Sequence, residues 1–346
     1  MVSTQLVLIA LAIEAVALAV GLALLAGHGG WLAVRERRLA PRLAAARAAI
    51  LTGLVERPSQ QLPLAPLEAL PFDERLRVLG EAAASVAGAQ RSHLRGLARR
   101  AGVLDRAGAL CRSRRWKRRL RGARMHTLLG GGEAVMPALL SDRRAEVRVE
   151  AAAWAAEHPE PEIVARLLEL LGDPAARCRF TVHDSLMRLG PAAVAPLVDF
   201  LASVGGARAA AGLQVAASLR DPRLLDAAHR LLSDEDAETR RRAVDLLGAL
   251  GGERALAALT DRLSDPVADV RAAAARALGQ GQHWTAAAQL TAALRDRSWD
   301  VRSAAGMALR GLGAPGELLL ERMLADEDRF AVEMARLMLD LPGAPA

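Results

Sequence analysis

The sequence of 346 residues contains no tyrosine, only four phenylalanines and only five tryptophans, although 52% of its residues are hydrophobic. A core with so few aromatic side chains must be built from alanine, leucine and valine. These residues suit close packing between helices better than a β-sandwich or a barrel. We therefore expect an all-α protein.

Cysteine and lysine are also scarce. The two cysteines, Cys111 and Cys178, exclude a disulfide framework and have no metal-site spacing, so we expect a reducing compartment and two small buried thiols. Lys117 is the single lysine among 46 basic residues, so arginine carries the basic charge.

Groups of residues that could perform catalysis are missing as well. The seven histidines lack the spacing of metal ligands, and no lysine followed by serine or threonine comes after the glycine run at 130–132, which we expect to be a turn between helices. We predict no catalytic residues, no metal and no cofactor, and hence a protein that is not an enzyme.

A long apolar segment stands at the N-terminus. Residues 5–27 contain one charged residue, Glu14, and a helix of this length can cross a hydrocarbon core of about 30 Å. A cleaved signal peptide is the alternative, but no basic residue precedes Arg35. Arginines that follow the segment predict one membrane pass in the bacterial inner membrane, with the N-terminus outside and the rest of the chain in the cytoplasm; they are Arg35, Arg37, Arg38, Arg42 and Arg47.

Glu14 lies near the middle of this predicted transmembrane helix, where a carboxylate costs about 2.5 to 3.5 kcal/mol. Ala10, Ala17 and Gly21 share its helix face, an arrangement that favours close contact with another membrane helix. Glu14 is therefore a candidate partner-binding residue. The alternative is a protonated or interfacial side chain without a function.

A repeat of about 31 residues follows in the C-terminal two thirds of the chain. It is marked by aspartates at 142, 173, 234, 265, 296 and 326, and a gap of 61 residues leaves room for one degenerate repeat near 204–208. An apolar or small residue comes five positions after the aspartate in the first five of these repeats, and an arginine comes six positions after it; the arginines are Arg148, Arg179, Arg240, Arg271 and Arg302. The last repeat lacks this arginine, as expected for a terminal repeat.

Each repeat is long enough for two helices that cannot bury their apolar faces alone, so stacked repeats are expected to form an α-solenoid with a long concave surface. We predict that the aspartate caps the second helix and that proline sometimes takes the first helical position, as in Asp173-Pro174 and Asp265-Pro266. The arginine is expected to reach neighbouring acidic side chains.

The stretches "LSDPVADVRAAAARALG", "LRDRSWDVRSAAGMALRGLG" and "LSDEDAETRRRAVDLLGALG" resemble HEAT repeats of the short bacterial kind, also called PBS-lyase HEAT-like repeats. The resemblance implies an α-solenoid of about seven to eight helix pairs and a role in scaffolding and protein binding. Some relatives are phycobilin lyases or DNA-alkylation glycosylases, but no motif assigns either activity to a residue here.

Basic charge is concentrated near the start of the predicted repeats. Residues 28–124 hold 21 basic and 7 acidic residues, a net of +14, whereas residues 125–346 hold 25 basic and 31 acidic residues, a net of −6. The densest part, which we call the basic cluster, comprises Arg112, Arg114, Arg115, Lys117, Arg118, Arg119 and Arg121. It is predicted to contact an anionic lipid surface or an acidic partner. A solvated face without a ligand is the alternative, and nucleic acid is disfavoured because base-stacking aromatic residues are lacking.

Four segments are expected: the transmembrane helix at 5–27, a juxtamembrane helix and Pro-rich linker at 28–71, short helices that cover the solenoid's N-terminal end at 72–109, and the solenoid at 110–346. Trp299, three residues after its repeat aspartate, is predicted to be exposed and is a second candidate partner-binding residue.

The sequence thus predicts a membrane-anchored, non-catalytic scaffold whose cytoplasmic solenoid binds and positions a partner protein. A membrane enzyme such as an envelope glycosyltransferase would be one example. A lyase or other ligand-handling enzyme of the PBS-lyase type is the alternative.

Overall fold

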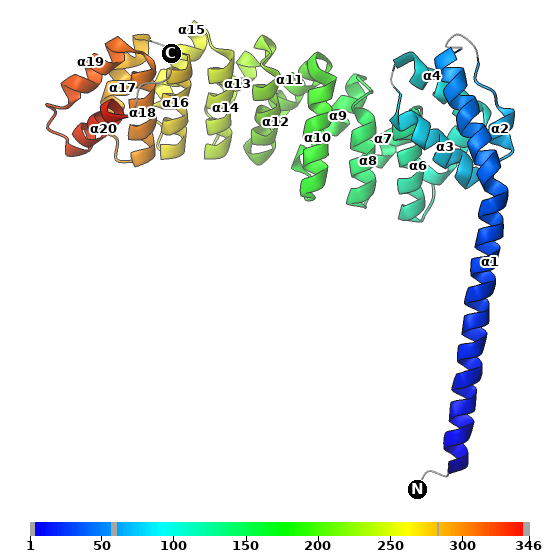
Figure 1. Ribbon diagram of the computed structural model, residues 1–346. Coiled ribbons are helices and arrows are strands. Elements are labelled where there is room, and N and C mark those ends of the chain that lie inside the picture. The colour runs from blue at the N-terminus through cyan, green and yellow to red at the C-terminus, as the bar shows by residue number, and fades with distance from the viewer. Residues whose placement is uncertain (1–3, 57–60, 87, 282–283, 342–346) are drawn as a thin grey trace. The chain divides into compact units, whose positions relative to one another are not determined.

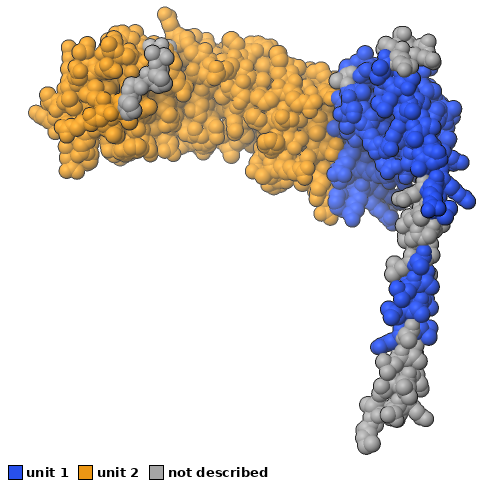
Figure 2. All heavy atoms as spheres, in the orientation of Figure 1, with its two compact units in different colours: residues 1–136 blue, residues 137–346 orange. Residues whose placement is uncertain are grey.

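The computed structural model describes residues 4–56, 61–86, 88–281 and 284–341, and every regular element among them is a helix (Figure 1). The predicted all-α class is therefore confirmed for this part of the chain. The chain forms two compact units, Met1–Met136 (unit 1) and Pro137–Ala346 (unit 2), which Figure 2 shows in different colours.

Unit 1 is built around one hydrophobic core. Its helices are α1 (Thr4–Glu56), α2 (Ala65–Glu68), α3 (Phe72–Ala84), α4 (Gly88–Arg100), α5 (Val103–Cys111) and α6 (Trp116–Leu129). The core includes Ile50 and Leu54 of α1, Leu79 of α3 and Leu97 of α4, each at most 2% exposed. The last turns of α1 are thus part of the folded unit.

Helix α1 is continuous over 53 residues, or about 80 Å at 1.5 Å per residue. The sequence predicted a transmembrane helix and a separate juxtamembrane helix, but no break divides them, and Pro41 lies inside α1. Many side chains of the predicted span, including those of positions 5–13, lie outside the described set, as does that of Arg35. Among the described ones, Val16, Leu18, Val20 and Leu22 are each more than half exposed. In Figure 1 this part of α1 stands apart from the other helices of unit 1.

The Pro-rich segment does not act as a spacer in its described part, 61–71. Leu62, Leu67 and Leu70 are at most 4% exposed and belong to the core of unit 1, and Arg100 Nη2 donates a hydrogen bond to Leu62 O at 2.5 Å. The prediction of a linker is corrected here, because the prolines separate short elements whose leucines pack inward. Residues 57–60 of the predicted linker lie outside the described residues.

Among the described residues, one segment has the length and composition to cross a membrane, Ala176–Ser203, and half of its most apolar stretch is buried. This segment comprises α10 (Ala176–Leu189), the 3-10 turn η2 (Gly190–Ala193) and α11 (Val194–Ser203). Its buried residues include Leu186 and Leu197, both fully buried, so it belongs to the core of unit 2.

Unit 2 is a series of helix pairs. Beginning at the boundary with unit 1, the remaining α-helices are α7 (Met136–Leu139), α8 (Ala145–Ala155), α9 (Pro161–Glu169), α12 (Gly206–Leu219), α13 (Leu225–Leu231), α14 (Ala237–Leu250), α15 (Glu253–Arg262), α16 (Ala268–Gln280), α17 (Ala287–Ala293), α18 (Trp299–Gly311), α19 (Ala314–Met323) and α20 (Arg329–Asp340). Short 3-10 turns η1 (Leu170–Gly172), η3 (Pro222–Leu224) and η4 (Trp284–Ala286) join some of them. The described helices from α7/α8 to α19/α20 make seven pairs, and α5 packs on α6 in unit 1. These numbers agree with the predicted seven to eight pairs.

The even-numbered helices from α8 to α20 form one layer, in which each helix contacts the next (Figure 1). Small residues allow these helices to approach closely. A Cβ atom added to Gly248 of α14 would lie 2.7 Å from Ala277 Cβ of α16, and one on Gly279 of α16 would lie 2.7 Å from Ala308 Cα of α18. The alanine-rich composition therefore determines the spacing of this layer.

Candidate protein-binding groove

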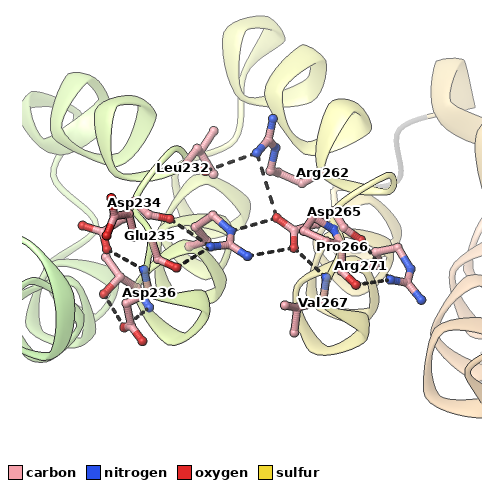
Figure 3. A network of polar contacts seen from close by, with 11 residues as sticks. Leu232, Asp234, Glu235, Asp236, Arg262, Asp265, Pro266, Val267 and Arg271 are labelled. Atoms are coloured by element: carbon pink, nitrogen blue, oxygen red, sulfur yellow. Dashed lines mark hydrogen bonds and ion pairs between the residues drawn. The ribbon is translucent and has the colours of Figure 1, made fainter.

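The repeat aspartates and arginines form a ladder that connects neighbouring repeats. Arg240 Nε and Nη2 donate to Asp265 Oδ2 and Oδ1 at 2.9 and 3.1 Å, and Arg271 makes the same bidentate contact with Asp296 at 2.7 and 2.8 Å. Arg148 contacts Asp173 in the same way at 2.6 and 2.8 Å. The partner lies 25 residues downstream in these pairs, in the next helix pair. We call these contacts the Arg–Asp ladder, and Figure 3 shows the part of it around Asp265.

Each arginine of the ladder also binds its own repeat. Arg240 Nη1 donates to Asp234 O at 2.9 Å, and Arg271 Nη1 donates to Asp265 O at 2.8 Å (Figure 3). One guanidinium therefore bridges the turn before its own helix and the corresponding turn of the next repeat. This geometry explains why the spacing from aspartate to arginine is constant.

The predicted capping role of the aspartate is wrong in detail. Asp265 Oδ1 accepts a hydrogen bond from Val267 N at 2.9 Å, but Val267 is itself the N-cap residue of α16, so no first-turn N–H is capped. Pro266 precedes the N-cap and does not take the first helical position, and the same holds for Pro174 before the N-cap Ala175. The aspartate instead closes a turn before the helix and presents its carboxylate to the preceding repeat.

The ladder is interrupted at the degenerate repeat and open at its C-terminal end. At the degenerate repeat, Asp234 accepts from Gly206 N at 3.2 Å instead of from an arginine. At the C-terminal end, Asp326 pairs with Arg295, and the buried Nε of Arg302 has no hydrogen-bond partner among the described residues. The Arg302 guanidinium lies over the Phe330 ring, 4.9 Å from its centroid.

Beside the ladder, the surface of α16 and α18 forms a groove of about 680 Å³, which Arg241 of α14 also lines. Its floor consists of small residues, namely Ala272, Gly279, Ala304 and Ala308. Its larger side chains are Asp269 and Arg276 from α16 and Trp299, Asp300 and Met307 from α18. We call this site the groove. It is hollow because alanine and glycine leave space between the longer side chains of both helices.

Trp299 is the first residue of α18 and is 57% exposed, as the sequence predicted. The turn before it is held by Ser298 N, which donates to Asp296 Oδ1 at 2.8 Å. Because Asp296 also accepts from Arg271, the ladder sets the position of Trp299. Met307, two turns later on the same face of α18, is 53% exposed. Two large apolar side chains thus stand at the groove without cover.

Some charged side chains of the groove have ion-pair partners within the protein and others do not. Arg241 donates to Glu238 at 2.6 and 2.7 Å and to Asp245 at 3.0 Å. The Glu238 hydrogen bonds, opposed by burial, raise the pKa of Arg241, and Asp269 also contributes to this shift. In contrast, Asp300 has no hydrogen bond or ion pair to any described residue and is exposed. The unmatched charge next to Trp299 is therefore negative.

Sequence reasoning identified Trp299 but missed Asp269, Arg276, Asp300 and Met307. A helical spacing signal was present, because Trp299 and Met307 are eight positions apart on one helix, and Asp269 and Arg276 are seven positions apart on another. That signal does not show which faces of two successive repeats meet, so the groove itself could not be deduced.

The basic cluster lies in unit 1, at the turn after α5 and on α6. Six of its side chains are exposed, namely Arg112, Arg114, Arg115, Lys117, Arg118 and Arg121. Two members have partners within the unit, because Arg119 donates to Ser113 O at 3.0 Å and Arg121 pairs with Asp73 of α3. Its contact with lipid or an acidic partner stays a prediction. The same holds for partner binding by Glu14, whose side chain is exposed on α1.

The two thiols are buried, and burial raises the pKa of Cys111 and of Cys178 to about 11. Neither is a thiolate at neutral pH, so neither is activated as a nucleophile. The glycine run forms a turn between α6 and α7, with φ of 79°, 77° and 91° at Gly130, Gly131 and Gly132, as the sequence predicted.

Comparison with known proteins supports the helical-repeat architecture. The family model of HEAT repeats matches residues 132–213, 205–279 and 259–340. No curated protein sequence matches the chain. Among solved structures, importin beta is similar with a TM-score of 0.50 and 14% identity, over 86% of this chain and 48% of importin beta.

Two further solved structures are similar at lower scores. Human deoxyhypusine hydroxylase in complex with glycerol has a TM-score of 0.30 and 20% identity, over 88% of this chain and 98% of its own. The CpcE–CpcF complex of phycocyanin lyase from Nostoc sp. PCC7120 has a TM-score of 0.35 and 22% identity, over 60% of this chain and 94% of its own. At these identities the likeness concerns the fold alone.

Proposed function

The chain belongs to the HEAT-repeat proteins, and on this basis we propose that it is a membrane-anchored, non-catalytic adaptor whose solenoid binds and positions a partner protein. A HEAT-repeat solenoid suits protein binding because stacked helix pairs present an extended surface. The groove, with Trp299 at one end, is the part of this surface that we assign to the partner.

The observation that carries the anchor is the character of α1. Its described side chains Val16, Leu18, Val20 and Leu22 are exposed, whereas Ile50 and Leu54 near its other end are buried in unit 1. Exposed apolar side chains in such a row require a cover, and a lipid bilayer supplies one without any further protein. The arginines after the span orient unit 1 and unit 2 toward the cytoplasm of a bacterium. A partner in the same membrane, such as a glycosyltransferase of the envelope, fits this arrangement.

The anchor is tested by introducing charge into α1. We expect the double variant Leu18→Arg and Leu22→Arg to leave the membrane pellet after carbonate extraction, because each arginine costs about 2.5 to 3.5 kcal/mol in a bilayer. Leu51→Arg is the matched control, since Leu51 is 54% exposed on the same helix but outside the span. Release of the control together with the double variant, or retention of both, would contradict an anchor at residues 5–27.

The orientation is tested with single cysteines. Ser3→Cys is expected to react with a membrane-impermeant maleimide in intact spheroplasts, whereas Ser264→Cys in unit 2 should react only after lysis. The native thiols are buried and provide a low background. The opposite pattern would contradict a cytoplasmic solenoid.

The adaptor role is tested by cross-linking in intact membranes followed by mass spectrometry. We expect the wild-type protein to capture one specific protein. If the transmembrane helix makes the contact, Glu14→Ala should no longer capture that protein. If the basic cluster makes the contact, neutralisation of its exposed residues should abolish the capture. If neither the wild-type protein nor any variant captures a specific protein, the adaptor role is contradicted. A visible absorption band in the purified protein would instead favour the lyase-type alternative.

A further inference from the structure

We propose that the groove binds a partner segment that carries an arginine or lysine side chain next to an apolar one. This inference rests on the proposed protein-binding function and adds the chemistry of the partner. The basic side chain would lie against Trp299 between Asp269 and Asp300, and the apolar side chain would lie on Met307 and the alanine floor.

The charges around Trp299 select the sign of the partner. Asp269 and Asp300 are in the first turns of α16 and α18, and both line the groove together with Trp299. Arg241 is already held by Glu238 and Asp245, whereas Asp300 has no partner among the described residues. A cation from outside therefore finds free carboxylate oxygens here. An anion would have to compete with Glu238 and Asp245 for Arg241. The groove's other cation, Arg276, lies two turns after Asp269 on α16, away from the first turns that carry Asp269, Trp299 and Asp300.

The aromatic ring points to the same ligand. Trp is the aromatic side chain that binds cations best through its ring face, and an attraction of this kind grows when the cation is shielded from water. A partner segment that lies along the groove of about 680 Å³ and covers Trp299 would supply such shielding. Carboxylates and an indole ring in one groove form a site that recognises a guanidinium or ammonium group in two independent ways.

The far end of the groove offers an apolar contact at Met307, beside the Arg276 side chain of α16. Met307 is 53% exposed and stands above Ala304 and Ala308, which are 7% and 4% exposed. Methionine is flexible and adapts to apolar side chains of different shape. The overall charge of unit 2 agrees with a basic segment, because residues 137–346 hold 25 basic and 30 acidic residues, a net of −5.

A structural role for the two aspartates is the competing explanation. Carboxylates in the first turn of a helix interact favourably with the helix dipole, so Asp269 and Asp300 would stabilise α16 and α18 without any ligand. That explanation does not account for the exposed Trp299 that lines the same groove. The positions that correspond to Trp299 in three other repeats are Ala145, Ala237 and Ala268.

The experiment uses the full chain in phosphatidylcholine nanodiscs and a short fluorescein-labelled peptide with the core Leu-Arg-Leu-Leu-Arg. Matched peptides replace arginine by glutamate or leucine by serine, and binding is followed by fluorescence anisotropy. We expect the basic, apolar peptide to bind more tightly than either matched peptide, and we expect its affinity to fall as salt is raised.

Protein variants then locate the binding. Trp299→Ala should weaken binding about tenfold or more, as expected for an aromatic anchor that the bound partner buries. The double variant Asp269→Asn and Asp300→Asn should weaken binding and reduce its salt dependence. Trp284→Ala is the matched control, because Trp284 is 52% exposed but does not line the groove. Thermal unfolding of each variant shows whether the helices remain intact, so that loss of fold is separated from loss of the site.

Three results would overturn the inference: no binding of the basic peptide, equal or tighter binding of the glutamate peptide, or unchanged binding by Trp299→Ala and the double aspartate variant. Membrane fractionation and cross-linking test the proposed function separately. A chain that binds the peptide through Trp299 but is not held in the membrane would contradict the anchor alone. A chain that captures a membrane partner without the groove would contradict this inference alone.

Discussion

At the scale of single residues, the contact between Arg240 and Asp265 shows what the repeat signature does. The Asp265 side chain is 1% exposed and that of Arg240 is 11% exposed. Water therefore does little to solvate either charge, and each needs the other. The signature residues hold neighbouring repeats together, and the same contacts position the helix starts from which the groove side chains emerge.

Removal of one member of such a pair should be costly. We expect Asp265→Ala to lower the free energy of unfolding by about 3 to 5 kcal/mol, because the Arg240 guanidinium stays buried without its carboxylate. Urea unfolding followed by circular dichroism measures this loss. Asp226→Ala is the control, since Asp226 and Arg254 form an ion pair whose side chains are 83% and 67% exposed, and its effect should stay within about 0.5 kcal/mol. Equal effects of both substitutions would contradict the role of the ladder.

The ladder also predicts how stability depends on pH. Burial raises the pKa of Asp265, but hydrogen bonds from Arg240 and from Val267 N lower it by a larger amount. The pKa of Asp265 therefore lies below its ordinary value of 3.8. The pKa values of Asp173 and Asp296 are lowered for the same reasons, with burial opposing the arginine. These carboxylates stabilise the fold fully above their unfolded pKa, and the contribution is lost as pH falls through the lower folded pKa.

We therefore expect the urea midpoint to be nearly constant from pH 7 to pH 5 as far as these groups are concerned, and to fall as the pH is lowered below about 4. The measurement is a series of urea titrations at different pH values. In Asp265→Asn the fall should be smaller, because one of the titrating groups is gone. An identical acid dependence in wild type and variant would contradict the assignment.

At the scale of helices, small residues decide how closely the repeats approach. Gly279 of α16 faces Ala308 of α18, and a Cβ atom there would lie 2.7 Å from a backbone atom of α18. The backbone of a helix gives way less easily than the end of a flexible side chain. The composition rich in alanine and poor in aromatic residues is thus a requirement of this packing and not only a bias of the sequence.

A larger side chain at this contact should force the helices apart. We expect Gly279→Val to destabilise the protein by about 1 to 3 kcal/mol through overpacking. Gly172→Ala serves as the control, because an added Cβ atom there meets nothing within 4 Å. Thermal unfolding compares the two variants. A variant Gly279→Val as stable as wild type would show that α16 and α18 can separate at little cost.

At the scale of the whole molecule, α1 combines two roles in one element. Its first half offers exposed apolar side chains, and its last turns supply Ala46, Ile50 and Leu54 to the core of unit 1. The proposed anchor is thereby joined to a folded unit by continuous helix. Movement of the anchor and of unit 1 would be coupled, because no loop separates them.

Two truncations distinguish these roles. Deletion of residues 2–30 is expected to release the protein from membranes while unit 1 stays folded, since the core residues of α1 remain. Deletion of residues 2–56 removes them, and we expect increased proteolysis within residues 61–136 and a lower thermal midpoint. Limited proteolysis and circular dichroism measure both effects. Equal stability of the two truncated proteins would contradict the place of α1 in the core of unit 1.

The sequence by itself determined the helical class, the register of the repeats and the buried positions within them. Val147, Cys178, Val270 and Val301 are all fully buried where the repeat placed an apolar residue. These features follow from the local period of apolar side chains, because one face of each helix must leave water whatever its neighbours are. Exposure of Trp299 could also be predicted, since it stands at the start of a helix.

Only the tertiary structure decided which groups meet. The ladder arginines bind carboxylates 25 residues downstream and not on their own helix. The groove is lined by Asp269 and Arg276 of one repeat together with Trp299 and Met307 of the next. Leu62, Leu67 and Leu70 turned an expected linker into core. The physical reason is common to all three cases. A side chain's partner depends on the distance and angle at which separate helices pack, and a linear pattern of residues does not contain that information.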